Sequence, residues 1–111
     1  MIFDIMTLFP ELVTYVLGES IIGRAQKSGV IEVACHNIRD YSEDKHHRVD
    51  DTPYGGGKGM LMAAPPIYNC YAHIRELRQG QAQKTRVVYL SPAGSLFHQK
   101  KAEKLAQNYD H

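Results

Sequence analysis

Short strand-like segments and segments with helical periodicity alternate along this chain. The strand-like segments are apolar and often β-branched, and they cover 2–8, 30–35, 60–62 and 87–90. Apolar residues recur at helical spacing over 10–17, 21–27, 65–77 and 97–109. This alternation predicts one α/β domain, with a mainly parallel sheet and flanking helices, across all 111 residues.

The composition is that of a folded chain without a membrane anchor. Hydrophobic residues make up 43% and charged residues 23% of the sequence, so enough apolar surface exists to offset the chain entropy. No apolar run approaches the ~20 residues that span a bilayer, and the segment 1–4 lacks the features of a signal peptide. Two cysteines, Cys35 and Cys70, do not form a disulfide scaffold. We therefore expect a cytoplasmic protein whose cysteines are packing residues.

The small net charge of +1 hides a segregated distribution. Residues 75–104 carry seven basic and two acidic side chains, whereas residues 1–74 carry six basic and nine acidic ones. A basic segment of this kind attracts a polyanion such as RNA. The alternative is that these lysines and arginines form ordinary solvated helix faces.

A glycine-rich segment lies inside a long polar stretch that runs from 37 to 59. Tyr54 is followed by Gly55, Gly56, Gly57, Lys58 and Gly59, and such a loop lets a phosphate or a planar base approach the main chain. The spacing fits neither a Walker loop nor the GxGxxG fingerprint. A flexible turn between two elements is the alternative interpretation.

Two further segments contain residue types that suit metal, phosphate or ligand binding. His46 and His47 stand near Asp50 and Asp51, which would suit a metal-dependent hydrolase, although no HExxH or CxxC pattern accompanies them. We favour a solvated charged loop. Contact of Lys45, His46 and Arg48 with phosphates is a further alternative. Residues 90–94 follow the last predicted strand, and ligands of α/β sheets bind at such carboxyl ends. A plain strand-to-helix turn explains this segment equally well. Three isolated histidines have no assigned role: His36, His73 and His98.

Several separated motifs together resemble one family. The chain is similar, in order and spacing, to the N-terminal part of the bacterial tRNA (guanine-N1)-methyltransferases, which belong to the SPOUT class with a deep trefoil knot. The segments that carry the resemblance are FDIMTLFPE at 3–11, ESI at 19–21, RA at 24–25, HNIRD at 36–40, DKH at 44–46, VDD at 49–51, PYGGG at 53–57, GM at 59–60 and LSP at 90–92.

The resemblance implies transfer of a methyl group from S-adenosylmethionine to N1 of the guanine just 3′ of the anticodon. It also implies a homodimer in which each active site is built from both subunits. One wall of the cofactor pocket would be formed by Tyr89, Leu90, Ser91, Pro92 and Gly94. The target guanine and neighbouring RNA would lie near Asp50, Tyr54, Gly55, Gly56, Gly57 and Gly59.

The family pattern continues beyond the last residue of this chain. We expect residues 1–111 to be the N-terminal part of a SPOUT domain that is truncated before the knot is complete, without the helical C-terminal domain. The family's general base is expected beyond His111, which leaves Asp50 as a minor candidate for removing the N1 proton. We therefore expect the 111-residue chain to bind the cofactor weakly or not at all and to transfer no methyl group. The alternative function is a non-catalytic RNA-binding or dimerisation module derived from this family.

Overall fold

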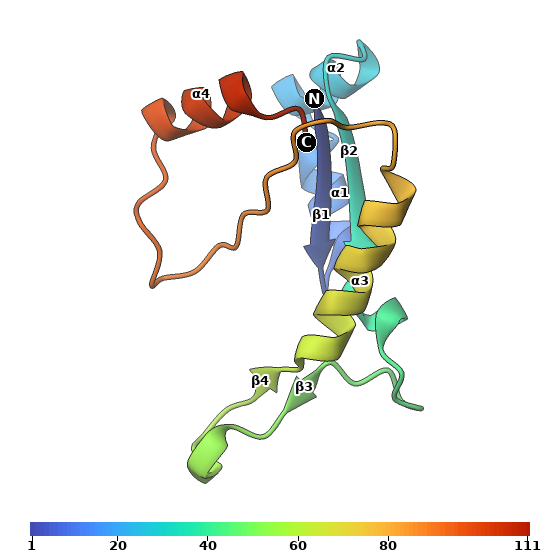
Figure 1. Ribbon diagram of the computed structural model, residues 1–111, viewed down its shortest axis with the longest axis vertical. Helices are drawn as coiled ribbons and strands as arrows, with labels where there is room; N and C mark the ends of the chain where they lie inside the picture. The colour runs from blue at the N-terminus through green and yellow to red at the C-terminus, as the bar shows by residue number, and fades with distance from the viewer.

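A computed structural model describes all residues from Met1 to His111. The chain forms four helices, four strands and two short 3-10 turns (Figure 1). In chain order these are β1 (Ile2–Thr7), α1 (Pro10–Leu17), α2 (Ser20–Lys27), β2 (Glu32–Asn37), η1 (Ile38–Tyr41), β3 (Asp50–Asp51), η2 (Tyr54–Gly56), β4 (Leu61–Met62), α3 (Ala64–Leu77) and α4 (Gln99–Asn108).

The centre of the fold is a parallel pair, β1 and β2, with the helices α1 and α2 as the connection. The register runs from Ile2 opposite Glu32 to Thr7 opposite Asn37. Pro10 occupies the first turn of α1, where its missing N–H costs no hydrogen bond. Gly29 follows α2 with a φ of 76°, the left-handed conformation that commonly ends a helix. The predicted α/β fold with a parallel sheet is confirmed.

The turn from α1 into α2 depends on a glycine. The backbone of Gly23 lies so close to the end of α1 that a Cβ atom there would stand 2.1 Å from the carbonyl oxygen of Gly18. Real Cβ atoms do not approach backbone oxygens this closely, so a larger residue would push the two helices apart. Gly23 therefore sets the angle at which the crossover returns to β2.

Helix α3 packs against η1 and the end of β1 and completes a small apolar core. The buried apolar residues are Ile38, Val49, Cys70 and Ile74. Met6, Leu8, Tyr41 and Ile67 are partly buried and pack around them. The core thus joins η1, α3 and the end of β1. Cys70 is free and fully buried, which confirms its prediction as a packing residue, whereas Cys35 is free and only partly buried.

Two parts of the chain project away from this core. Residues 50–62 form a narrow antiparallel hairpin in which Asp50 pairs with Met62 and Asp51 with Leu61. Residues 79–98 contain no helix or strand, and they lead out to α4 on the other side of the molecule (Figure 1). The surface area of 8962 Å² exceeds the roughly 6,200 Å² expected for a compact chain of this mass. The radius of gyration, 15.9 Å, likewise exceeds the expected value of about 13 Å.

The predicted strand at 87–90 is wrong. These residues form no strand, and their side chains are exposed, with Tyr89 at 86% and Leu90 at 84%. A β-branched, apolar run becomes a strand only where a neighbouring strand accepts its backbone hydrogen bonds, and none borders residues 87–90. The parallel sheet consequently has two strands. The second strand also begins later than predicted, at Glu32, and extends to Asn37.

The four helices agree with the sequence pattern to within a few residues. The predicted helix at 65–77 is α3, and the one at 97–109 is α4. No helix in the structure is both long enough and apolar enough to cross a membrane.

Candidate functional site

The glycine loop forms the exposed tip of the 50–62 hairpin. Gly55 and Gly56 have φ angles of 79° and 72°, left-handed conformations that residues with a Cβ atom rarely adopt. No heavy atom lies within 4 Å of the Cβ position at either glycine, nor at Gly57 or Gly59. Tyr54 is fully exposed. The loop therefore offers bare main chain and one aromatic ring to an incoming ligand.

Asp50 and Asp51 precede the loop on strand β3. Both residues are exposed, and the carboxylate of Asp51 accepts a hydrogen bond of 2.7 Å from the amide of Thr52. No side-chain hydrogen bond involves Asp50, so its carboxylate is available to a ligand at the base of the loop. The structure thus places these acids and the glycine loop on the same hairpin.

The charged turn before this hairpin is organised by Asp44. Its carboxylate accepts hydrogen bonds from the guanidinium of Arg48, at 2.9 and 3.1 Å, and from the amides of His46 and Arg48. The hydrogen bond from Arg48 is the main reason why the pKa of Asp44 lies well below its usual range. The imidazole Nδ1 of His47 lies 3.3 Å from the carbonyl oxygen of Arg39.

The structure does not gather the candidate metal ligands. No three His, Cys, Asp or Glu side chains form a group that could hold a metal ion. His46, His47, Asp50 and Asp51 therefore do not form the centre that a metal-dependent hydrolase needs.

The segment proposed as a cofactor wall is a turn on the exposed 79–98 segment. The amide of Gly94 donates to the carbonyl oxygen of Ser91 at 3.0 Å, and the amide of Ala93 donates to the Ser91 hydroxyl at 3.2 Å. Tyr89 and Leu90 lead into this turn with exposed side chains. The predicted turn is present, although the strand expected before it is not.

The turn and the glycine loop lie on different projections of the molecule. Figure 1 shows the loop at the lower tip of the hairpin and the 89–94 segment in the long connection to α4. No hydrogen bond joins the two segments. One copy of these residues therefore does not bring the predicted guanine site and the predicted cofactor wall together.

A buried ionic cluster around Asp4 is the feature that sequence reasoning missed. The Asp4 side chain is 2% exposed, and its oxygens accept hydrogen bonds from Nε and Nη2 of Arg78 at 2.7 and 3.0 Å. The Nε2 atoms of His36 and His111 lie 2.7 and 2.8 Å from the same carboxylate. Arg78 also binds Glu32 at 2.8 Å. The cluster therefore ties β1, β2, the end of α3 and residue 111 together.

The hydrogen bonds of this cluster reverse the effect of burial on Asp4. Burial by itself would raise the pKa of the carboxyl, but the hydrogen bonds from Arg78, His36 and His111 lower it to about 2. The Asp4 carboxylate likewise raises the pKa of Arg78. A single acid within the apolar run of β1 was the available signal, because a buried carboxylate requires a cationic partner.

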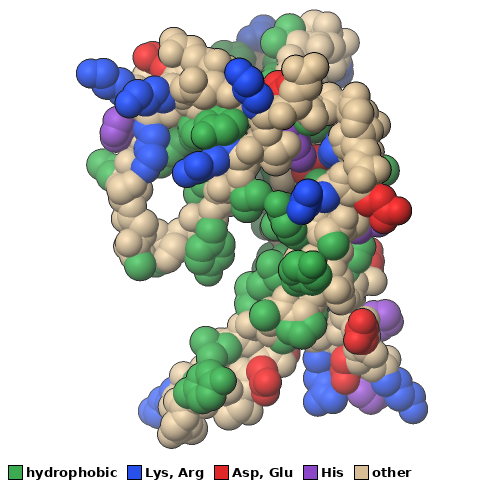
Figure 2. Space-filling view, viewed as in Figure 1, with side chains coloured by type: hydrophobic (Ala, Val, Ile, Leu, Met, Phe, Trp, Pro, Cys, Tyr) green, Lys and Arg blue, Asp and Glu red, His purple; other side chains and the backbone are tan.

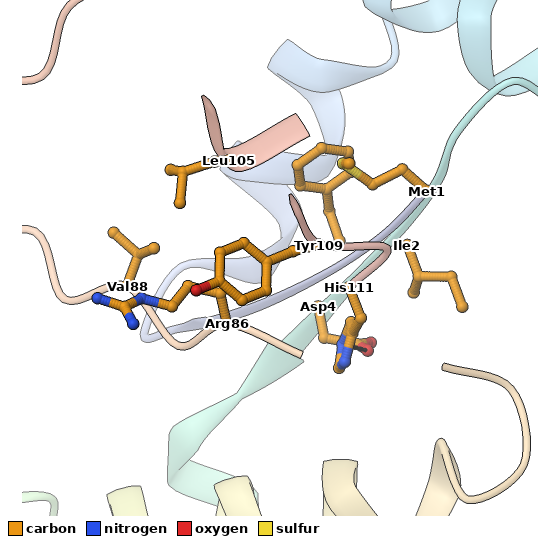
Figure 3. Close-up of a pocket in the computed structure, with 9 residues that line it drawn as sticks. Met1, Ile2, Asp4, Arg86, Val88, Leu105, Tyr109 and His111 are labelled. Atoms are coloured by element: carbon orange, nitrogen blue, oxygen red, sulfur yellow. Dashed lines mark hydrogen bonds and ion pairs between the residues drawn. The ribbon is translucent and has the colours of Figure 1, made fainter. Parts of the chain in front are cut away.

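A shallow hollow of about 210 Å³ lies beside the cluster (Figure 3). Residues of β1, the 84–88 segment and the end of the chain line it, and the Arg86 guanidinium carbon stands 5.8 Å from the centre of the Tyr109 ring. Figure 3 shows His111 directed at Asp4 on one side of the hollow and Val88 on the other. The hollow marks where the exposed segment meets the strands.

Residues 1–111 thus form an α/β domain that exposes two candidate ligand-binding segments, the glycine loop and the 89–94 turn. The family model described as tRNA (Guanine-1)-methyltransferase TrmD matches residues 1–110. The chain therefore belongs to the tRNA (guanine-1)-methyltransferase family.

Curated relatives and a solved structure agree with this assignment. A tRNA (guanine-N(1)-)-methyltransferase of Ruminiclostridium cellulolyticum is 52% identical over 105 residues, which are 95% of this chain and 44% of the relative. One from Thermomicrobium roseum is 53% identical over 105 residues, or 94% of this chain and 38% of the relative. The crystal structure of a tRNA (m1G37) methyltransferase from Aquifex aeolicus superposes with a TM-score of 0.65 and 32% identity, over 69% of this chain and 34% of that one. The chain thus spans less than half the length of these relatives.

Proposed function

We propose that these residues form the N-terminal part of an S-adenosylmethionine-dependent tRNA methyltransferase that modifies N1 of the guanine 3′ of the anticodon. The observation that carries the proposal is the family match over residues 1–110, because that range includes both the glycine loop and the 89–94 turn. The whole protein, in this proposal, has a SPOUT knot to which residues 1–111 contribute the N-terminal portion. It acts in the cytoplasm.

The glycine loop is the proposed guanine-binding element. Single-stranded bases are recognised by stacking on aromatic rings and by close approach to the main chain. Tyr54 provides a fully exposed ring, and the glycines beside it leave the main chain uncovered. The free carboxylate of Asp50 at the base of the loop is suited to a hydrogen bond with the base edge or, as the minor candidate, to accepting the N1 proton.

The 89–94 turn suits one wall of a pocket for S-adenosylmethionine. Tyr89 and Leu90 present apolar surface to the uncharged parts of such a ligand, while the Ser91–Gly94 turn brings backbone groups to its edge. The bound cofactor supplies an electrophilic methyl group. The chain's own residues bind and orient it, and Pro92 limits the conformations of the turn.

A homodimer would join the two separated elements. The loop and the turn lie on different projections of one chain, so a second copy is the simplest way to bring a loop against a turn (Figure 1). This arrangement supports the expectation that each active site takes residues from both subunits.

Basic residues supply the attraction for tRNA. Figure 2 shows Lys and Arg side chains gathered over α4, which carries Lys100, Lys101 and Lys104, all of them on the segment with excess positive charge. Contacts of this kind weaken steeply with salt because each neutralised phosphate releases a counterion.

A filter-binding assay tests the RNA part of this proposal. The chain should retain a tRNA transcript at low salt, and the logarithm of the binding constant should fall linearly with the logarithm of the salt concentration. A transcript with adenine in place of the guanine 3′ of the anticodon is the matched control and should bind less tightly. Equal retention of both transcripts at every salt concentration would contradict the proposed guanine site.

A labelled methyl group tests the chemistry separately. Incubation of the 111-residue chain with labelled S-adenosylmethionine and tRNA should give no incorporation, and calorimetry should show cofactor binding weaker than micromolar. Tight binding or incorporation would overturn the expectation that this portion is inactive by itself.

A non-catalytic RNA-binding or dimerisation module is the second candidate. The observation that favours it is the separation of the two predicted sites within one copy. Binding of tRNA by the whole protein without any methyl transfer would support the module and exclude the enzyme.

A further inference from the structure

The segment that carries the proposed cofactor wall is held to the strands of the molecule at one place. Residues 79–98 contain no helix or strand, so their position depends on individual contacts. Gln81 contacts the end of α3, and Ser95 accepts a hydrogen bond from Lys101 of α4. Most of the other contacts gather at residues 83–86, which lie beside Tyr109, Asp110 and His111. We call residues 109–111 the clasp.

Asp110 forms the first half of the clasp. Its two carboxylate oxygens accept hydrogen bonds from the amides of Gln83 and Lys84, at 3.1 and 2.9 Å. Its own amide donates to the Lys84 carbonyl oxygen at 3.0 Å, and its carbonyl oxygen accepts from the amide of Ile2 at 2.9 Å. One residue thus joins the exposed segment to β1.

His111 forms the second half. Its carbonyl oxygen accepts from the amide of Arg86 at 2.8 Å, and its Nε2 atom lies 2.8 Å from the Asp4 carboxylate. Because that carboxylate only accepts, a neutral His111 donates from Nε2, and its Nδ1 atom accepts the hydroxyl proton of Thr85 at 3.0 Å. The imidazole therefore bridges the exposed segment and the buried ionic cluster. Figure 3 shows it beside Asp4.

We infer that Asp110 and His111 are positioning residues that hold residues 83–86 beside β1 and so fix the origin of the 89–94 turn. The turn starts only three residues after Arg86, and Tyr89 and Leu90 are too exposed to hold it by packing. The role assigned to the turn itself rests on the proposed function.

Amide hydrogen exchange of the 111-residue chain tests the placement without any cofactor. In Asp110→Ala the amides of Gln83 and Lys84 should exchange at least about tenfold faster, as expected when a hydrogen bond to a charged group is lost. Exchange within the β1–β2 pair should not change. Glu19→Gln is the matched control, since the Glu19 side chain does not cap α2 and lies far along the chain from residue 83.

A conservative variant separates positioning from a general loss of structure. Asp110→Asn keeps one carbonyl oxygen, so it should restore the protection of one of the two amides and not of the other. Thr85→Val should accelerate exchange at Arg86, because it removes the hydroxyl that contacts His111. Unchanged exchange in Asp110→Ala, or equal acceleration throughout β1 and β2, would overturn the inference.

Titration with S-adenosylmethionine then tests the consequence. Amide resonances of residues 90–94 should shift at a higher cofactor concentration in Asp110→Ala than in the unaltered chain, with partial recovery in Asp110→Asn. If the exchange results are as expected and no resonance of the unaltered chain shifts, the placement stands and residues 89–94 do not bind the cofactor without the rest of the pocket.

Discussion

The molecule divides into a packed body and two open projections. The body, formed by residues 1–49 and 64–78, holds the parallel strands, three helices, the apolar core and the buried Asp4 cluster except for His111. The projections, residues 50–62 and 79–111, hold the residues predicted to form the guanine site and the cofactor wall. Most contacts that stabilise the fold therefore lie in the body, and the proposed binding residues lie on the projections. Substitutions in the body should change the free energy of unfolding, whereas substitutions on the projections should change ligand binding.

The largest effect is expected for Arg78→Ala in the body. The substitution leaves the Asp4 carboxylate, 2% exposed, without its bidentate partner, and breaking a buried ion pair in this way costs roughly 3–5 kcal/mol of the free energy of unfolding. Urea denaturation measures this loss. Arg75→Ala, which removes only an exposed contact with the Tyr71 ring, is the control and should cost less than about 1 kcal/mol. Equal losses in Arg78→Ala and Arg75→Ala would show that the Asp4 cluster stabilises the body no more than an exposed contact does.

The next largest effect is expected for Gly23→Ala. The added Cβ atom would meet the Gly18 carbonyl oxygen at 2.1 Å, so the crossover must shift at a cost of about 2–3 kcal/mol in stability. Gly57→Ala in the projecting loop is the matched control, because no heavy atom lies within 4 Å of its Cβ position. Thermal unfolding of both variants compares the two regions directly. If Gly57→Ala were as destabilised as Gly23→Ala, close packing at Gly23 would not be the cause of the loss.

Acid should weaken the body through Asp4. The folded-state pKa of about 2 lies below the ordinary value of 3.8, so the carboxylate contributes stability that is present above pH 4 and is lost as the pH falls toward 2. The difference corresponds to about 2 kcal/mol. Denaturation at a series of pH values measures the loss. In Asp4→Asn the loss of stability between pH 4 and pH 2 should be smaller by that amount. An unchanged loss in this pH range would show that another carboxyl group is responsible.

The smallest effect on stability is expected for Tyr54→Ala in the glycine loop. The ring is fully exposed, so unfolding should change by less than about 0.5 kcal/mol. Affinity for tRNA should nevertheless fall about tenfold, because stacking of one base on an aromatic ring contributes about 1–3 kcal/mol. Tyr54→Phe should bind as tightly as the unaltered chain. A variant that loses stability but not affinity would place Tyr54 in the body.

The sequence predicted best those features that depend on residues close to one another along the chain. The strand β1, the helices α1 to α4 and the exposed glycine loop follow from periodicity, from Pro10 at a helix start and from glycines such as Gly29 at a helix end. The short strand at 60–62 was also predicted, whereas its pairing with Asp50 and Asp51 in a hairpin was not. The family assignment extended this local information to residues 1–110.

The buried cluster was not predictable in the same way. Asp4 meets Arg78 across 74 positions of the chain and His111 across 107. Arg78 looked like part of a solvated basic segment, and His36 looked isolated. Only their meeting at Asp4, near the middle of the parallel pair, turns them into a buried ionic cluster.

The sequence by itself therefore determined the kinds of local element, the family and the exposed loop, because each depends on short-range pattern. The tertiary structure decided that residues 87–90 are not a strand, that Asp4 is buried among cations, and that the clasp positions the exposed segment. The physical reason is the same in each case. Strand pairing and the burial of a charge both require a partner, and the position of that partner is set by the fold and not by the neighbouring residues.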